Sequence, residues 1–198
     1  MDDWRTTPIL TGRYVSLSPL ERADRSGLLE AFADGLEQAF ATIVPDEASI
    51  DGWYDRLEQE HAAGRALPFT VRDGAGRIAG ATRFLRIAPH YRRLEIGGTV
   101  YARRVQRTGL NTEAKRLLLG HAFDRLGAQC VQLRTDFLNR QSRRAIERLG
   151  ARQDGVLRGH MVLGDRPRDT VVYSILAHEW PGVRRNLDGL MAAHGDSP

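Results

Sequence analysis

The stretch Gln106-Arg107-Thr108-Gly109-Leu110-Asn111 joins a predicted strand to the strongest predicted helix of the chain. Backbone N–H groups at the start of a helix have no partner within it, and the helix dipole favours negative charge there. Gly109 would let the backbone approach a pyrophosphate closely, and Arg107 adds positive charge. The segment therefore predicts a site for a phosphate-bearing cofactor. The alternative is an ordinary capped turn between a strand and a helix.

The segment does not match two common nucleotide-binding patterns. A dinucleotide fingerprint would need G-x-G-x-x-G, and a Walker loop would need glycine, lysine and a hydroxyl residue in sequence. The helix that follows is predicted from Asn111 to Leu126. Asn111 or Thr112 would cap its start, and Gly127 would stop it.

Apolar periodicity predicts the elements before this helix. They are a strand at 13–20, helices at about 23–34 and 49–61, and strands around 69–71, at 78–87 and at 94–101. Trp53, Leu57 and His61 are expected to share one face of the second helix. An Asp-Gly turn at 73–74 predicts a hairpin between two of the strands.

The elements after the central helix follow from the same signals. A strand is predicted at 131–135, a helix at 139–149 that stops at Gly150, and strands near 156–158 and at 170–176. The order is strand, two helices, three strands, helix, strand, helix, two strands. This order favours a mixed α/β fold of the α+β kind, with one mostly antiparallel sheet and helices on both faces.

Composition indicates an ordinary globular protein of one domain. The 198 residues are 41% apolar and 27% charged, and the formal net charge is +4. Lys115 is the sole lysine among the basic residues, and Cys130 is the sole cysteine. A single cysteine excludes an internal disulfide, and the acidic start lacks the pattern of a signal peptide, so we expect a cytoplasmic protein that does not bind membranes.

Several other classes of function have little support in the sequence. The six histidines are scattered without a metal-binding spacing, so no metal is expected. No nucleophile elbow of a serine hydrolase is present. The arginines are spread along the chain without interleaved aromatics, so nucleic-acid binding is not expected, although a basic RNA-associated protein is a further alternative. Cys130 is expected to be a small core residue.

The stretch that starts at Gln106 resembles the acyl-CoA-binding signature of the GNAT superfamily, Q/R-x-x-G-x-G/A. Gln106 and Gly109 fit, whereas Asn111 replaces the usual glycine or alanine. The continuations N-T-E-A-K-R-L-L-L-G-H-A-F and L-R-T-D-F-L-N-R-Q-S-R-R-A-I-E-R-L-G-A are similar to the branch of ribosomal-protein N-terminal acetyltransferases of the RimJ/RimL type. The resemblance runs from about Leu10 to Leu190, within a single domain over 1–198.

The resemblance implies a GNAT fold whose sheet has a V-shaped splay, and an enzyme that transfers an acetyl or other short acyl group from acetyl-CoA to an amine. The acceptor would be a protein N-terminus or a small amine, and a homodimer is compatible with this branch. The alternative is an inactive acyl-CoA-binding module of the same fold. The acceptor loops near 41–50 and 159–168 contain no diagnostic motif.

The resemblance also implies roles for individual residues. The cofactor-binding set is Thr99, Val100, Tyr101, Gln106, Arg107, Thr108, Gly109, Leu110, Asn111, Thr112, Asn139 and Ser142. Backbone amides of 107–112 would hold the pyrophosphate, and the strand at 99–101 would splay and bond the pantetheine arm. Asn139 would touch that arm. Ser142 shares a helix face with Asn139 and would serve as the acid that meets the leaving thiolate.

A protonated amine cannot attack a thioester, so the reaction needs a group that accepts the amine's proton. Glu95 matches the strand position where several GNAT enzymes place a base glutamate, and it is the candidate base here. The alternative is a solvent-facing strand glutamate. A backbone N–H near Thr99 or Val100 would meet the developing oxyanion.

Overall fold

The computed structural model describes residues 2–33 and 44–195. Within these ranges, eight strands form one sheet in the order β1-β2-β3-β4-β5-β6-β8-β7. The strands are β1 Leu10–Thr11, β2 Val15–Pro19, β3 Ala66–Asp73, β4 Ile78–Ala88, β5 Arg93–Tyr101, β6 Cys130–Asp136, β7 Arg152–Leu163 and β8 Arg166–Leu176. The β5–β6 pair is parallel, and the other pairs are antiparallel. The mostly antiparallel mixed sheet predicted from the sequence is confirmed.

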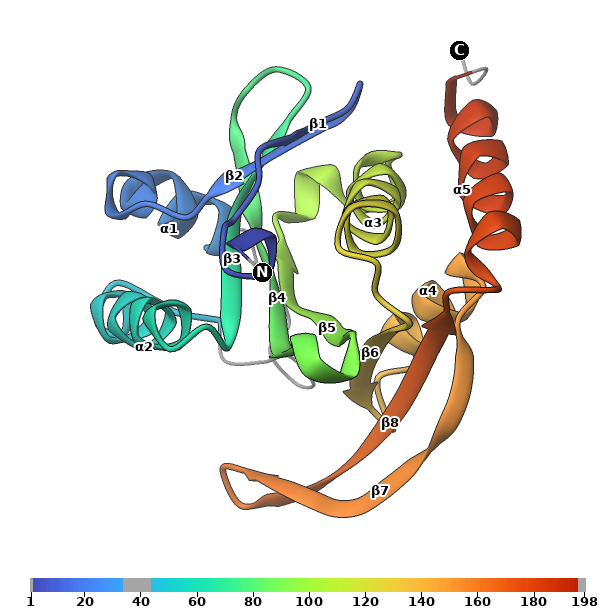
Figure 1. The fold of residues 1–198 in the computed structure, drawn as a ribbon. Coiled ribbons are helices and arrows are strands. Elements are labelled where there is room, and N and C mark those ends of the chain that lie inside the picture. Colours follow the sequence, from blue (N-terminus) through green and yellow to red (C-terminus); the bar gives the residue numbers. More distant parts are fainter. Residues whose placement is uncertain (1, 34–43, 196–198) are drawn as a thin grey trace.

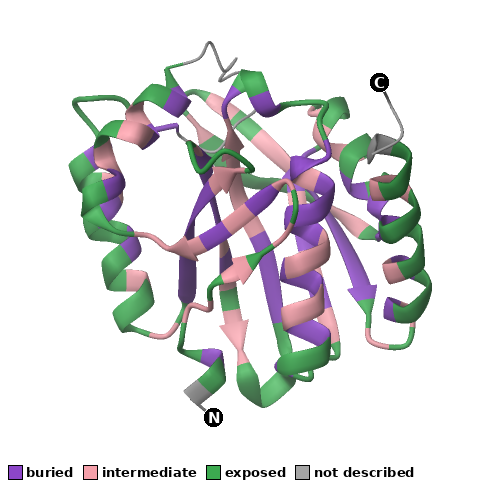
Figure 2. Ribbon diagram, turned by 90° about the horizontal axis from the view of Figure 1, so that it is seen from above, coloured by how far each residue is buried: buried purple, intermediate pink, exposed green. Residues whose placement is uncertain are grey.

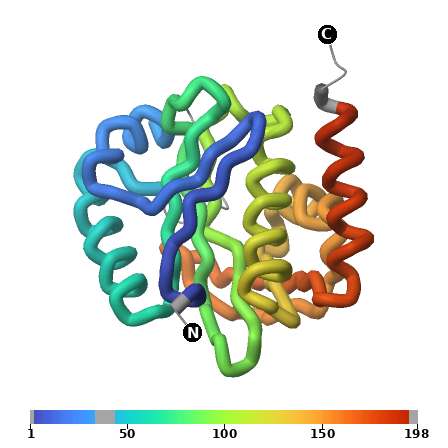
Figure 3. Tube along the Cα trace, turned by 45° about the horizontal axis from the view of Figure 1, so that its top comes forward, coloured from blue at the N-terminus to red at the C-terminus, as the bar shows by residue number. Residues whose placement is uncertain are grey.

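Helices cover both faces of this sheet (Figure 1). They are α1 Arg25–Phe32, α2 Ile50–Ala62, α3 Leu110–Gly120, α4 Arg140–Leu149 and α5 Trp180–Gly195. Helices α1 and α2 lie on one face, and α3 lies on the other, with α5 on the far side of α3 (Figure 3). Figure 2 shows the buried residues along the strands and on the inner sides of the helices. None of the helices in the described ranges is long and apolar enough to cross a membrane.

Two helix predictions differ from the structure. In α2 the buried side chains are Ile50, Tyr54 and Leu57, whereas His61 is exposed. The helical period of 3.6 residues explains this difference, because residues at i, i+4 and i+7 share a face better than residues spaced strictly by four. The predicted first helix also reaches Asp34, which lies outside the described residues.

The start of α3 is the second difference. The helix begins at Leu110 and its N-cap residue is Gly109, so neither Asn111 nor Thr112 caps it. Instead, the Leu110 N–H donates to Thr108 Oγ1 at 3.2 Å. After Gly120 the chain continues as a π-helical turn, His121–Arg125. The predicted stop is confirmed at Gly127, which has a left-handed φ of 66°.

The feature that positions the functional site is the separation of β5 from β6. Their parallel pairing spans Arg93↔Cys130, Leu94↔Val131 and Glu95↔Gln132, and it ends there. Beyond Glu95, β5 stays paired with β4 on its other edge, with an irregular register between Ala81 and Arg83. The two central strands therefore part in a V, as the resemblance predicted.

Two contacts hold the surrounding helices in place. The buried Glu113 carboxylate accepts hydrogen bonds from the backbone of Arg13 at 2.8 Å and of Tyr14 at 2.5 Å, which fixes α3 against the connection between β1 and β2. Trp180 stacks on Phe123 with ring centroids 5.4 Å apart, at the start of α5. Helix α5 and the short strand β1 were not predicted from the sequence.

Candidate active site

A cavity of about 460 Å³ opens where β5 and β6 part. Its walls are β5 residues 96–101, the end of β6, the first turns of α3 and one face of α4. Of the predicted cofactor-binding set, ten residues line it: Thr99, Val100, Tyr101, Gln106, Arg107, Thr108, Asn111, Thr112, Asn139 and Ser142. The fold thus brings residues that are more than forty positions apart in the sequence to one cleft.

The cleft passes from one face of the sheet to the other. Ile96 pairs with Phe84, whose ring stacks on His121 beyond α3, so Ile96 faces the α3 side. Neighbouring residues of a strand alternate between faces, so Glu95 and Gly97 belong to the side covered by α2. The lining includes residues of both sides, such as Lys115 from α3 and Arg134 from the opposite face. A long ligand can therefore enter on one face and end on the other.

The end of the cleft at α3 is suited to anions. Arg148 of α4 donates from Nη2 to Thr112 Oγ1 at 3.2 Å, which places its guanidinium beside the positive end of the α3 dipole. Arg107 also lines this end, on a left-handed backbone with φ of 61°. The positive end of the α3 dipole repels these two guanidinium groups. A bound phosphate group would relieve the repulsion, because its negative charge would lie between them. These residues fit the pyrophosphate of acetyl-CoA.

Gly109 and Leu110 are predicted site residues whose side-chain positions lie away from the cleft. A Cβ at Gly109 would come within 3.1 Å of the Tyr14 ring, and Leu110 is buried in the core. Glycine at this position lets the backbone pack closely against the Tyr14 ring. The contribution of these two residues to phosphate binding is therefore limited to their backbone N–H groups.

The middle of the cleft contains a chain of polar groups, of which Lys115 and Thr82 are buried and Thr99 is half-buried. Lys115 Nζ donates to Thr99 Oγ1 at 2.9 Å, and Thr99 Oγ1 lies 2.8 Å from Thr82 Oγ1. Lys115 is 6% exposed, and burial lowers its pKa from 10.5 to about 7. The contact holds Thr99 at the irregular part of β5, beside the backbone that was predicted to meet the oxyanion.

The wall formed by α4 begins with Asn139. Its side-chain Oδ1 accepts a hydrogen bond from the Ser142 N–H at 2.9 Å, so Asn139 is the N-cap of the helix rather than its first residue. This interaction uses one acceptor of Asn139 and leaves its amide N–H groups for a ligand. Ser142 is half-buried and lines the same wall.

Glu95 lies at the point of the V. Its side chain is 7% exposed, so the alternative of a solvent-facing glutamate is wrong. Glu95 Oε2 lies 3.0 Å from Arg86 Nε and 3.2 Å from Arg134 Nε, yet neither pair has good hydrogen-bond geometry, because Oε2 has no hydrogen-bond partner among the described residues. Burial raises the pKa of Glu95 above its ordinary 4.5, against the opposing charges of Arg134 and Arg86.

Gly97 brings this carboxylate to the edge of the cleft. A Cβ at Gly97 would lie 3.2 Å from Glu95 Oε1, and Gly97 itself lines the cavity. Glu95 itself does not line either cavity, so its carboxylate lies behind Gly97 rather than in the cleft wall. A buried carboxylate with a raised pKa, this close to the cleft lining, can accept a proton from a bound amine directly or through a water molecule.

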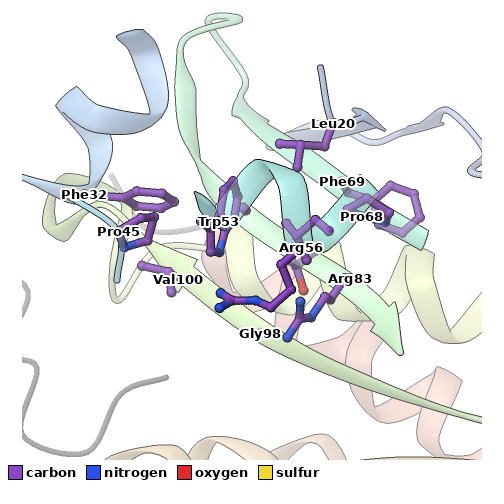
Figure 4. A pocket seen from close by; sticks show the side chains of 13 residues that line it. Leu20, Phe32, Pro45, Trp53, Arg56, Pro68, Phe69, Arg83, Gly98 and Val100 are labelled. Atoms are coloured by element: carbon purple, nitrogen blue, oxygen red, sulfur yellow. The ribbon is translucent and has the colours of Figure 1, made fainter. Parts of the chain in front are cut away.

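A smaller cavity lies on the other side of β5, under α2 (Figure 4). Trp53, Arg56 and Arg83 line it, and it shares Gly98 and Val100 with the main cleft. Figure 4 shows Arg56 and Arg83 next to Gly98. Both cavities therefore border the glycine pair of β5, Gly97 and Gly98, although Gly97 lines only the main cleft.

Several site residues were missed by sequence reasoning. Lys115 had a signal, since it is the only lysine in an arginine-rich chain. Arg148 and Arg168 had none, because arginine is frequent throughout the sequence. Arg134 was part of the quoted L-R-T-D run, but its proximity to Glu95 depends on strand register. Cys130 is partly buried and outside the lining of the cleft, and no group of three potential metal ligands occurs in the described ranges.

Comparisons with known proteins give a consistent result. Residues 15–152 match the family model of the acetyltransferase (GNAT) domain. YoaA of Bacillus subtilis, named an uncharacterized N-acetyltransferase, is 30% identical over 83% of this chain and 79% of its own length. YdaF of the same organism, provisionally named a ribosomal N-acetyltransferase, is 30% identical over 55% of this chain, and the match spans only 59% of YdaF.

Solved structures resemble the whole fold. A GCN5-related N-acetyltransferase from Brucella melitensis has a TM-score of 0.82 and 32% identity, with 94% of this chain and 86% of that chain covered. RimJ from Mycobacterium smegmatis, solved with CoA-disulfide, has a TM-score of 0.81 over 94% of this chain and 96% of its own. At 20% identity, the second likeness concerns the fold alone.

Proposed function

Because the chain belongs to the GNAT acetyltransferase family, as the sequence resemblance predicted, we propose that it transfers an acetyl group from acetyl-CoA to a primary amine by direct attack in a ternary complex. The acceptor is a small-molecule amine or the N-terminal amine of a protein. The observation that supports this most strongly is the buried carboxylate of Glu95 beside Gly97, where β5 and β6 part.

In this proposal, acetyl-CoA and the amine reach the reacting carbonyl from different faces of the cleft. The pyrophosphate binds at the start of α3, near Arg107 and Arg148, and the pantetheine arm follows β5 from Tyr101 towards Gly97. The thioester then lies between the strands at Thr99 and Val100. A backbone N–H there donates to the carbonyl oxygen as negative charge develops. The amine reaches the carbonyl carbon from the side of Glu95.

The transfer balances without another reactant. The amine nitrogen forms a bond to the acetyl carbon, and the carbon–sulfur bond breaks. Glu95 accepts the proton that the nitrogen loses, and the thiolate takes a proton from the Ser142 hydroxyl, the candidate donor on α4. Ser142 regains a proton from water as Glu95 releases its own, so the net proton moves from the amine to the thiol. The products are an N-acetylated amine and the free thiol of coenzyme A.

The proposal is tested by measuring thiol release from acetyl-CoA with a panel of primary amines, with the Glu95→Gln variant measured in parallel. The wild type should release thiol in proportion to the amide formed. Binding of acetyl-CoA without thiol release for any amine would contradict the proposal and would favour the inactive acyl-CoA-binding module.

We also propose a cytoplasmic location and a homodimer. The single partly buried thiol of Cys130 suits a reducing compartment. On β7, Leu157, Met161 and Val162 are exposed apolar residues, and a second copy of the chain would cover them. Light scattering on the purified protein should give twice the mass of one chain; a mass of 22.2 kDa would contradict the dimer.

A further inference from the structure

Four arginines surround Glu95 on the α2 side of the sheet: Arg83, Arg86, Arg134 and Arg168. We call them the arginine cluster. Strand register explains the shared face of three members. Arg83 pairs with Gly97, two residues after Glu95. Arg134 lies two residues after Gln132, the partner of Glu95. Arg134 in turn pairs with Val172, which is two strand periods from Arg168.

Three members of the cluster are largely buried, Arg86 is half exposed, and the cluster has more positive charge than its neighbouring carboxylates can balance. The side chains of Arg83, Arg134 and Arg168 are 17%, 17% and 12% exposed. Their Nε atoms have no hydrogen-bond partner among the described residues. Burying a cationic donor without an acceptor is costly, so these Nε–H groups need a further acceptor, such as a ligand or a water molecule.

The carboxylates near the cluster are few, and one of them already has another partner. Glu60 lies 3.4 Å from Arg83 Nη1. Asp136 pairs with Arg166 at 2.5 Å and is 3.9 Å from Arg168 Nε. Glu95 pairs with both Arg86 and Arg134, so one negative charge faces two positive charges. The positive charge that remains lies at the walls of the two cavities, because Arg134 and Arg168 line the main cleft and Arg83 lines the smaller one.

We propose that the arginine cluster is the subsite for an anionic group on the acceptor. The substrate class is then a primary amine that bears a carboxylate or phosphate close to the amine. This inference rests on the proposed function, since it concerns the acceptor of the same reaction. A guanidinium offers paired donors that match a carboxylate or phosphate.

The cluster has two consequences for the acceptor. An anion bound by Arg134 and Arg168 would hold the amine beside Glu95 at the glycine pair of β5. Nearby positive charge also disfavours the protonated form of the amine and thereby favours the nucleophilic form. Conversely, an acceptor with several positive charges would be repelled from this end of the cleft.

The test compares matched acceptors that differ only in charge near the amine. One pair is a free α-amino acid and its primary amide; the other is two peptides with the same first residue, followed by aspartates or by lysines. We expect kcat/KM to favour the acidic member of at least one pair by about ten-fold or more. Preference within the amino-acid pair identifies an α-carboxylate, and preference only within the peptide pair identifies an acidic protein N-terminus.

Arg168→Gln provides the residue-level test, because Asp136 keeps its contact with Arg166. The variant should lose about ten- to a hundred-fold in kcat/KM for the acidic acceptor, through KM, with little change for the amide. Arg168→Lys should keep part of the preference in kcat/KM for the acidic acceptor over its amide. Arg185→Gln, an exposed change on α5, is the matched control and should behave as wild type.

Three results would contradict the inference: a wild type that prefers the amide and the lysine peptide, an Arg168→Gln variant that loses activity equally for both members of a pair, or an Arg168→Lys variant that folds normally but shows no preference. In each of these cases the acetyl transfer itself still occurs. Absence of thiol release with every acceptor would instead overturn the proposed function, and this inference with it.

Discussion

Lys115 combines burial with the absence of a carboxylate partner among the described contacts. Its Nζ contacts Thr99 Oγ1, and its pKa is lowered to about 7 by burial. The folded state therefore gives up this proton near neutrality, whereas the unfolded chain keeps it up to about pH 10.5. Between these values the unfolded state binds more protons, so the free energy of unfolding rises with pH.

This behaviour gives a prediction for Lys115→Met, which keeps the length of the side chain and removes the charge. The wild type should gain up to about 1.4 kcal/mol in stability per pH unit between about pH 7 and 10, relative to the variant. Chemical denaturation of both proteins across that range measures the difference. If the free energies of unfolding of the wild type and the variant instead change with pH in parallel, Lys115 stays charged in the folded protein.

Single residues also show where sequence reasoning reached its limit. Glu95 was identified as the candidate base from its position on a strand in the family pattern. Neither its burial nor its arginine neighbours were predicted from the sequence. Those neighbours come from β4, β6 and β8, and their approach depends on register and on a bulge near Arg86, whose φ is 50°. A one-residue slip would move each of them to the other face.

At the scale of elements, α3 and α4 meet at the phosphate end of the cleft. Both helices were predicted, because their glycine stops and apolar spacing are local signals. The resemblance placed both helices at one cofactor, but their direct contact was not predicted, since the hydrogen bond between Arg148 and Thr112 joins residues thirty-six positions apart. Helix α5 was not predicted for the same reason. Its packing depends on contacts of Trp180 with α3 and with the turn after α3, which are distant in the sequence.

The contact between the helices predicts a specific effect of Arg148→Gln. Removing the guanidinium should weaken acetyl-CoA binding by about ten- to a hundred-fold, the usual range for a hydrogen bond to a charged group. Isothermal calorimetry measures the change, and Arg144→Gln is the matched control because Arg144 is exposed on the same helix and does not line the cleft. Equal affinities for the Arg148→Gln variant and the control would remove Arg148 from the phosphate site.

For the whole molecule, the cleft is bordered by four elements: β5, β6, α3 and α4. A ligand in the V contacts all of them and binds only the folded state. Acetyl-CoA should therefore raise the free energy of unfolding by mass action, by about 2.7 kcal/mol at a hundred times its dissociation constant. Thermal denaturation with and without acetyl-CoA tests this, and a dinucleotide serves as the control ligand. A shift with the dinucleotide alone would contradict the cofactor assignment.

The overall architecture was predicted better than the site, for a physical reason. Strand alternation and helix spacing are properties of neighbouring residues, and they were sufficient for β2 to β8, for α1 to α4 and for their order along the chain, but not for β1 and α5. The splay depends on the loss of pairing after Glu95, which no local pattern specifies. It was expected only from the family resemblance.

The most direct test of the account is the pH dependence of kcat/KM for wild type and Glu95→Gln with the same acceptor. If Glu95 accepts the amine's proton, the variant should lose about 10²- to 10⁴-fold near neutral pH, with acetyl-CoA affinity nearly unchanged. The loss should shrink as pH rises and the amine arrives deprotonated. On the acid side, the wild-type rate should fall as pH drops through the pKa of Glu95, which burial raises above 4.5. A folded variant with wild-type turnover near neutral pH would contradict the account.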